Sequence, residues 1–352
     1  AANVNLDQQT EAFTINGSSG NDTIFSGSGN DTIFGDNGDD IITGAAGIDS
    51  LSGGEGNDIF LIASASDHAY SGTLETISGG NGSADTIRYT STTATETLFL
   101  SSGVSGVESV VISDASGDTT GTSAVNVNAA NLANGTGITI TGNDGNNTLT
   151  GNDDGASTLN GGGGNDSLVG GSSADSLVGA AGADTLKGGG GSDTLTGGSD
   201  SDTFVLEESL TASGYDLITD FTAGAAGDVL DFYGSTSYDA VNILDYTLGG
   251  AGADITLVNG TVYRLKENSD GLLAAADFVL SAAAGTTSTT QNLILDTGVS
   301  SWLIVGDTTG DSSVGIYHVS NTAGTLFIEH LTTVTLVGGT TLNDIVAGNI
   351  VL

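Results

Sequence analysis

The chain has 352 residues, enough to bury several cores, and its 43 acidic and 4 basic residues give it a formal net charge of -39. Nucleic acids and anionic membranes are bound through clustered Lys and Arg, so this charge excludes them as partners and favours a cation. Cysteine is absent, which excludes disulfides, and no apolar run approaches the roughly 18 residues that a membrane span needs.

The N-terminal part of the chain, 1–62, is predicted to form an initial strand and a first β-roll. Val4, Leu6, Phe13 and Ile15 are the apolar positions of the initial strand over residues 1–16. An aspartate then recurs every nine residues, and a buried-type apolar residue follows each one two positions later. Several glycines in each period are incompatible with a helix and predict a turn followed by a short strand. The aspartates are Asp22, Asp31, Asp40, Asp49 and Asp58, and the apolar residues are Ile24, Ile33, Ile42, Leu51 and Phe60.

Residues 141–206 carry a second array in the same register. Asn147 and Ser157 occupy the aspartate position in its first two, weaker repeats. The aspartates of the array are Asp166, Asp175, Asp184, Asp193 and Asp202, each two residues before Leu168, Leu177, Leu186, Leu195 or Phe204.

Two nine-residue units are predicted to form one coil of a flattened helix, with the apolar residues pointing inward. Aspartates two repeats apart, such as Asp22 and Asp40, then stack on one edge. Strands lie about 4.8 Å apart and Ca²⁺ binds oxygen at about 2.3 to 2.6 Å, so one ion can contact two neighbouring loops. Aspartate also favours Gly-rich turns by itself, but that preference does not explain ten aspartates in a fixed register.

The pattern G-G-x-G-x-D-x-U-x, in which U is apolar, resembles the calcium-binding repeats of the RTX (repeats-in-toxin) family. The resemblance implies an all-β fold with parallel β-roll or β-helix arrays and about six to ten Ca²⁺ ions. It also implies that the repeat aspartates are ligands, together with carbonyl oxygens of the loop glycines. The implied metal-site residues are Asp22, Asp31, Asp40, Asp49, Asp58, Asp166, Asp175, Asp184, Asp193, Asp202, Gly20, Gly29, Gly38, Gly47, Gly56, Gly164 and Gly182.

The remaining segments lack the nine-residue period but keep a β-like pattern. Residues 63–140 are predicted to form an irregular β-helical segment, within which residues 106–110 resemble a short element of RTX-type surface-layer proteins of Gram-negative bacteria. Residues 207–352 are predicted to form a β-roll cap, with the family form D-x-I-x-D-F at 216–221, and a β-rich C-terminal module. A short helix is expected at 272–276, and the apolar C-terminal end resembles a type I secretion signal.

No catalytic motif is present. H-E-x-x-H and a G-x-S-x-G elbow are both missing, so we expect no enzyme. The sequence favours an extracellular, cell-surface, calcium-binding structural protein that is secreted by a type I system. We expect it to assemble with copies of itself into a layer or filament, with cell-surface polysaccharide as a further candidate partner. Two alternatives stay open: the C-terminal folding and secretion region of a larger secreted enzyme or toxin, and a calcium-stiffened adhesin segment. The chain starts without Met, which favours a longer parent protein.

Phe25 and Phe34 directly follow the apolar residues of the first two repeats. Neighbours of an inward residue point outward, so these rings are candidates for an assembly contact. The alternative is that flanking loops cover them.

Overall fold

The computed structural model describes residues 1–68, 75–132, 137–207, 216–222 and 227–233 and the strands between residues 243 and 351. The chain forms two compact units, Ala1–Gly189 and Gly190–Leu352. The described residues are all-β apart from one 3-10 turn, η1 (Ala65–His68), and the predicted all-β class with parallel arrays and a β-rich C-terminal module is confirmed. None of them lies in a helix long and apolar enough to cross a membrane.

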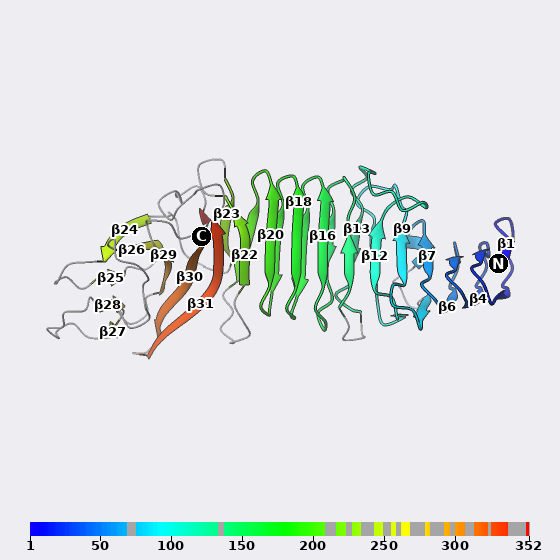
Figure 1. Cartoon of the computed structure of the whole chain (residues 1–352), viewed down its shortest axis with the longest axis horizontal. Coiled ribbons are helices and arrows are strands. Elements are labelled where there is room, and N and C mark those ends of the chain that lie inside the picture. The colour runs from blue at the N-terminus through cyan, green and yellow to red at the C-terminus, as the bar shows by residue number, and fades with distance from the viewer. Residues whose placement is uncertain are drawn as a thin grey trace. The chain divides into compact units, whose positions relative to one another are not determined.

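The first unit is a solenoid whose coils stack through parallel strand pairs (Figure 1). One sheet, which we call the long sheet, runs through all coils of the first unit. Its strands are, in order, β1 (Asn3–Asn5), β3 (Thr23–Phe25), β5 (Ile41–Thr43), β7 (Ile59–Ile62), β9 (Thr86–Tyr89), β12 (Ser109–Ile112), β14 (Thr139–Thr141), β16 (Thr158–Gly163) and β18 (Ser176–Ala181).

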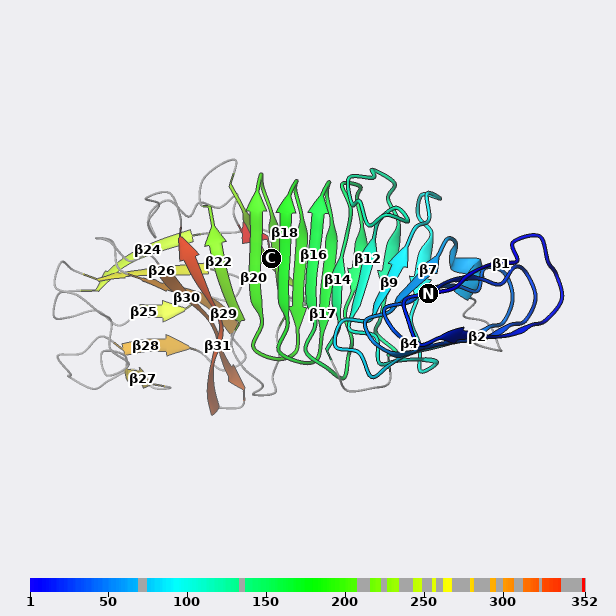
Figure 2. The ribbon, with the colours of Figure 1, turned by 45° about the vertical axis from the view of Figure 1, so that its right-hand side comes forward.

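Two shorter sheets share the other side of this solenoid. We call them the first and second facing sheets, and Figure 2 shows β2 and β4 of the first one apart from β1 of the long sheet. The first contains β2 (Thr14–Ser18), β4 (Thr32–Asn37), β6 (Ser50–Glu55), β8 (Thr76–Gly80) and β11 (Val104–Ser105). The second contains β10 (Thr97–Phe99), β13 (Asn126–Asn128), β15 (Thr148–Thr150), β17 (Ser167–Gly171) and β19 (Thr185–Gly189).

The solenoid core consists of the apolar residues that the nine-residue pattern selects. Ile24, Ile33 and Ile42 are at most 1% exposed, and Leu51 and Phe60 at most 3%. Strand register places them on one another, with Ile24 opposite Ile42 and Ile42 opposite Phe60. Burying each such side chain contributes about 1.5 to 3 kcal/mol, so the stacked column stabilises coil on coil.

The first coil contains two strands where the sequence predicted one. Val4 on β1 pairs with Ile24, and Ile15 on β2 pairs with Ile33. The polar run 7–11 between β1 and β2 is exposed and lies outside both strands. Residues 1–18 therefore form a full coil, with one strand in the long sheet and one in the first facing sheet.

The irregular segment continues the solenoid with larger coils. Regular coils advance by two repeats, as from Thr23 to Ile41. The register of the long sheet then steps from Ile59 to Thr86, Ser109 and Thr139, and each of these advances is longer than two repeats. Between β9 and β12 the chain passes through β10 and then β11, so this one coil starts the second facing sheet and ends the first.

The second unit contains the last repeats and the C-terminal strands. The predicted cap segment Asp216–Phe221 is β22, and it is not the last strand of its sheet, because β31 (Thr325–Leu336) pairs parallel with it. In the same way, β32 (Ile350–Val351) pairs with β23 (Val229–Tyr233). These pairings cover strand edges that would otherwise be open. The predicted helix at 272–276 lies outside the described residues.

The strands of the second unit lie in three sheets, and its antiparallel pairs are β29 with β30 and β30 with β31. The largest has the order β20 (Thr194–Ser199), β22, β31 (Thr325–Leu336), β30 (Ser313–Thr322), β29 (Ser300–Gly306), β26 (Val262–Glu267) and β24 (Ile243–Leu248). The others are β21 (Thr203–Glu207), β23 (Val229–Tyr233) and β32 (Ile350–Val351), and β25 (Ile255–Leu257), β28 (Asn292–Leu295) and β27 (Val279–Ser281).

Candidate metal centre

The repeat aspartates lie just before the short strands, at the point where each Gly-rich loop enters the sheet. All ten are buried, with exposed fractions of 0 to 3%. Burying a carboxylate is costly unless hydrogen bonds or a cation compensate the charge. The contacts of each carboxylate oxygen therefore decide what this edge of the solenoid can bind.

One oxygen of most of these aspartates connects two coils. The backbone N–H of one aspartate donates to Oδ1 of the aspartate in the next coil, and the repeated contact forms a ladder along the solenoid edge. Such hydrogen bonds to a charged acceptor are about twice as strong as neutral ones. The N to Oδ1 distances are 2.7 Å from Asp22 to Asp40, 2.8 Å from Asp40 to Asp58, 2.8 Å from Asp31 to Asp49 and 2.7 Å from Asp166 to Asp184.

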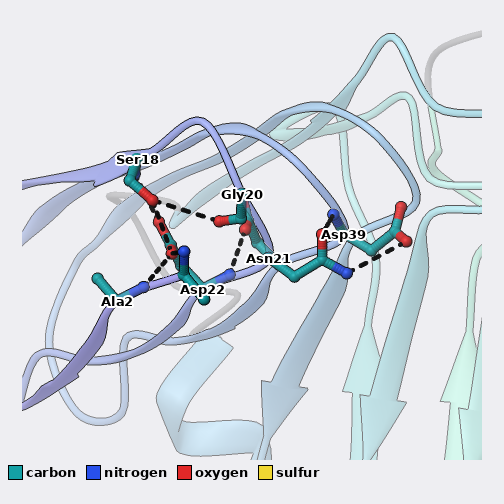
Figure 3. Close-up of polar contacts among 8 residues, drawn as sticks. Ala2, Ser18, Gly20, Asn21, Asp22 and Asp39 are labelled. Carbon is teal, nitrogen blue, oxygen red and sulfur yellow. Dashed lines mark hydrogen bonds and ion pairs between the residues drawn. The ribbon is translucent and has the colours of Figure 1, made fainter.

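We call each aspartate of this ladder, together with its hydrogen bonds, a rung. The rung at Asp22 shows how the loop surrounds a carboxylate (Figure 3). Oδ1 accepts from the backbone of Ala2 and from the Ser18 hydroxyl at 2.9 Å, and Oδ2 accepts from the Ser18 backbone at 2.5 Å. A second, exposed rung lies beside it, in which the Asp39 backbone donates to Oδ1 of Asn21 at 3.1 Å. Loop and ladder contacts thus fix the position of the carboxylate.

The second oxygen of several internal rungs is buried without a hydrogen-bond partner. It points at the backbone of a glycine five residues earlier, and a Cβ at Gly35, Gly53 or Gly161 would clash with Oδ2 of Asp40, Asp58 or Asp166. These glycines therefore make room for the carboxylate. The unpartnered atoms include Oδ2 of Asp31, Asp40, Asp49, Asp58, Asp85 and Asp166.

These oxygens suit calcium. A carboxylate oxygen and backbone carbonyls are ligands that Ca²⁺ prefers, and it takes six to eight of them. Within the described residues no three His, Cys, Asp or Glu side chains converge on one point, so most ligands must be carbonyls or water. The predicted glycines lie in the same loops and stack coil on coil, since the carbonyls of Gly29, Gly38 and Gly164 lie against the backbones of Gly47, Gly56 and Gly182. Gly20 lies likewise against Gly38.

Burial perturbs the protonation of the internal aspartates. Burial, with a smaller contribution from neighbouring carboxylates, raises the pKa of Asp49 to about 7, of Asp58 to about 6 and of Asp166 to about 7. At Asp22 burial also raises the pKa, but hydrogen bonds from Ala2 and Ser18 outweigh it and bring the pKa below its ordinary value. A bound cation would favour the charged form of these three carboxylates, which burial disfavours.

The weaker repeats use neutral side chains at the same position. Asn147 donates its backbone N–H to Oδ1 of Asp166 at 2.7 Å, as an aspartate would, but its side-chain amide also donates to the Val125 carbonyl at 2.7 Å. Ser157 donates to Asp175 through its backbone, and its hydroxyl bonds within its own loop, to Gly155 at 3.3 Å. These rungs satisfy their hydrogen bonds without a cation.

The ladder extends beyond the residues that the sequence predicted. The Asp58 backbone donates to Oδ1 of Asp85 at 2.7 Å, and Asp85 donates to Oε2 of Glu108 at 2.8 Å. On the opposite edge of the solenoid, Thr76 pairs with Ser50 of the preceding coil. Glu75 directly precedes Thr76 as Asp49 directly precedes Ser50, so Glu75 occupies the aspartate position of its coil. The sequence contains the pattern that identifies these acids, because each of them stands two residues before a buried apolar residue. The longer coils interrupt the nine-residue spacing, so the spacing alone does not find them.

The second unit has its own acidic rungs. Asp193 donates to Oδ1 of Asp216 at 3.0 Å, and Asp202 to Oδ1 of Asp228 at 2.9 Å. Oδ2 of Asp228 accepts from the Thr222 backbone at 2.7 Å. The pairs Asp175/Asp193 and Asp184/Asp202 join residues of different units, so their pairing stays a prediction.

The two phenylalanines lie in different sheets. Phe25 is half-buried on β3 in the long sheet, whereas Phe34 is 41% exposed on β4 in the first facing sheet. They therefore do not form a common patch.

The family model described as RTX calcium-binding nonapeptide repeat (4 copies) matches residues 14–42, 34–61, 137–168, 152–186 and 169–204. These matches cover both arrays and leave out the longer coils that contain Asp85 and Glu108. No curated protein matches the chain.

Proposed function

Since this chain belongs to the family of RTX calcium-binding repeat proteins, we propose that it is an extracellular structural protein whose folding and self-assembly depend on Ca²⁺. The observation that carries the proposal is the aspartate ladder, in which one oxygen locks neighbouring coils and the other is buried without a partner. Six to ten ions would occupy the two arrays, held by the repeat aspartates and loop carbonyls.

The calcium concentration differs between the two sides of a cell membrane. Extracellular calcium modules work at about 10⁻⁴ to 10⁻³ M, far above the concentrations that cytosolic sensors detect. A chain with a net charge of -39 would stay unfolded where calcium is scarce and would order after export. Proteins with RTX repeats are typically secreted, and the proposed route is a type I system that delivers the chain to the cell surface.

Assembly is proposed to follow from the remaining charge. Eight ions would cancel about 16 of the 39 negative charges, so exposed carboxylates such as Asp39 stay available to calcium between copies. No catalytic step is part of the proposal.

Electron microscopy of the purified full chain tests the assembly. Ordered sheets or filaments are expected at millimolar calcium and should dissolve in EGTA. Persistent monomers at high protein and calcium concentration would contradict a structural role and favour a folding region of a larger secreted protein.

A further inference from the structure

An open groove of about 550 Å³ crosses the first facing sheet where its strands end. It spans four consecutive coils, from β2 through β4 and β6 to β8, and Figure 2 shows β2 and β4 side by side at this part of the solenoid. The repeat aspartates do not line it, although Ser18 at its edge also donates to the buried carboxylate of Asp22.

The floor of the groove is backbone. Gly54 and Gly80 pair in register and have φ values of 115° and 111°, which other residues adopt only with strain. A Cβ at Gly54 would meet the Asp36 carbonyl, and one at Gly80 would meet the Gly54 carbonyl. No side chain can therefore fill the groove from these positions.

One wall is an aromatic ring. Phe34 is 41% exposed, and its partners in the adjacent coils are Asn16 and Ser52. Ser52 in turn pairs with Ser78. Because these neighbours are small or short, the Phe34 ring projects above its row and lines the groove.

The other wall is a row of hydrogen-bonding side chains. Asn37 pairs with Glu55, and the Asn81 amide donates to Oε1 of Glu55 at 2.7 Å. These groups repeat at the strand spacing of about 4.8 Å, so a ligand that runs along the solenoid meets a polar group at each coil. The rigid sheet holds the row in place, which limits the entropy lost on binding.

We propose that this groove binds a neutral oligosaccharide. An aromatic face packs against the C–H face of a sugar ring, while carboxylate and amide groups bind its hydroxyls. The groove lining contains Asp36 and Glu55 but no Lys or Arg, so an anionic chain would be repelled. A lipid or apolar peptide would find only one apolar side chain, Phe34, among the residues that line it.

Isothermal titration calorimetry of the calcium-loaded full chain tests the proposal. The probes are cellohexaose, maltohexaose and xylohexaose, with hexagalacturonate as an anionic comparison. At least one neutral probe should bind with a Kd at or below the millimolar range, and hexagalacturonate should not. Phe34→Ala should weaken binding about tenfold or more. Asn37→Ala should weaken it less.

Phe99→Ala is the matched control, because Phe99 is 38% exposed on β10 in the second facing sheet and outside the groove. It should bind like the unchanged chain, and circular dichroism should show that all variants keep their β content. The proposal is overturned if no neutral probe binds, if only hexagalacturonate binds, or if Phe34→Ala and Phe99→Ala bind alike. It is also overturned if Phe34→Ala abolishes self-association in sedimentation and leaves sugar affinity unchanged, since the occupant would then be a second copy. These readouts do not require assembly, so they can fail or succeed separately from the proposed structural role.

Discussion

The backbone N–H of Asp40 donates a 2.8 Å hydrogen bond to Oδ1 of Asp58 in the next coil, while Oδ2 of Asp58 is buried against Gly53 without a hydrogen-bond partner. The two oxygens of one carboxylate thus have different tasks. Oδ1 sets the register between coils, and Oδ2 leaves a buried negative charge that only a proton or a cation can compensate. The stability of the solenoid is therefore coupled to cation binding.

Removal of calcium should unfold the chain. In excess EGTA the internal carboxylates lose their compensating charge, so the far-ultraviolet circular dichroism should lose its β signal. Added Ca²⁺ should restore it. Mg²⁺ is the control and should restore much less, because it gives up its water reluctantly and demands octahedral geometry. An unchanged β spectrum in excess chelator would contradict the folding role of the ladder.

An internal rung should matter more than a terminal one. Asp40 bonds to Asp22 on one side and to Asp58 on the other, whereas Asp22 is the first aspartate of its ladder. In Asp40→Asn the amide can still accept the Asp22 N–H, but it loses the charged oxygen. We expect a loss of about 1 to 3 kcal/mol in unfolding free energy in calcium, and a smaller loss for Asp22→Asn. Urea unfolding measures both, with the exposed Asp7→Asn as the control; equal losses at Asp40 and Asp22 would refute the shared-rung geometry.

Gly53 should not tolerate a methyl group. In Gly53→Ala the new Cβ would clash with Oδ2 of Asp58, so we expect weaker calcium binding and a loss of about 1 to 3 kcal/mol. Gly121→Ala is the matched control, since a Cβ there meets its nearest neighbour, the Asn143 amide, at an ordinary 3.7 Å. Calcium titration and thermal melts compare the two. If both variants behave alike, the glycine does not serve to make room for the carboxylate.

Asp85 should hold calcium although it lies outside the matched repeats. Its Oδ1 accepts from Asp58, its Oδ2 is buried without a hydrogen-bond partner, and a Cβ at Gly79 would clash with the carboxylate, as in the regular rungs. Asp85→Asn should lower the number of bound ions by about one per chain, as measured by equilibrium dialysis. Asp118→Asn, at an exposed turn, should leave the number unchanged. If Asp85→Asn binds as many ions as the unchanged chain, Asp85 does not bind calcium and the calcium-binding part of the ladder stops at Asp58.

The nine-residue register was sufficient to predict the coils, the buried column from Ile24 to Phe60 and the edge on which the aspartates lie. It could not predict how the chain passes from the first to the second facing sheet, because β10 and β11 belong to a coil without the period. Residues 79–87 have the form of one expanded repeat, but Asp85 and Glu108 were not predicted as site residues, since the coils there are longer than two repeats. The pairing of β22 with β31, which lies far later in the sequence, depends on distant strands that no local pattern identifies.

The pH dependence of stability should have opposite signs with and without calcium. Burial raises the folded-state pKa of Asp49 and Asp166 to about 7 and of Asp58 to about 6, above the value near 4 of an unfolded aspartate. A raised carboxyl pKa contributes stability that is fully present below the unfolded pKa and is lost as pH rises through the folded one. In EGTA the β signal in circular dichroism, which reports the fraction of folded chain, should therefore fall from pH 5 to 7.5, where the chain is unfolded. In saturating calcium the chain stays folded, and its urea midpoint should rise over the same range, because the ion binds the deprotonated carboxylates. Asp166→Asn should flatten the EGTA profile, while a chelated chain that gains stability with pH would show that these carboxylates are compensated by something other than a cation.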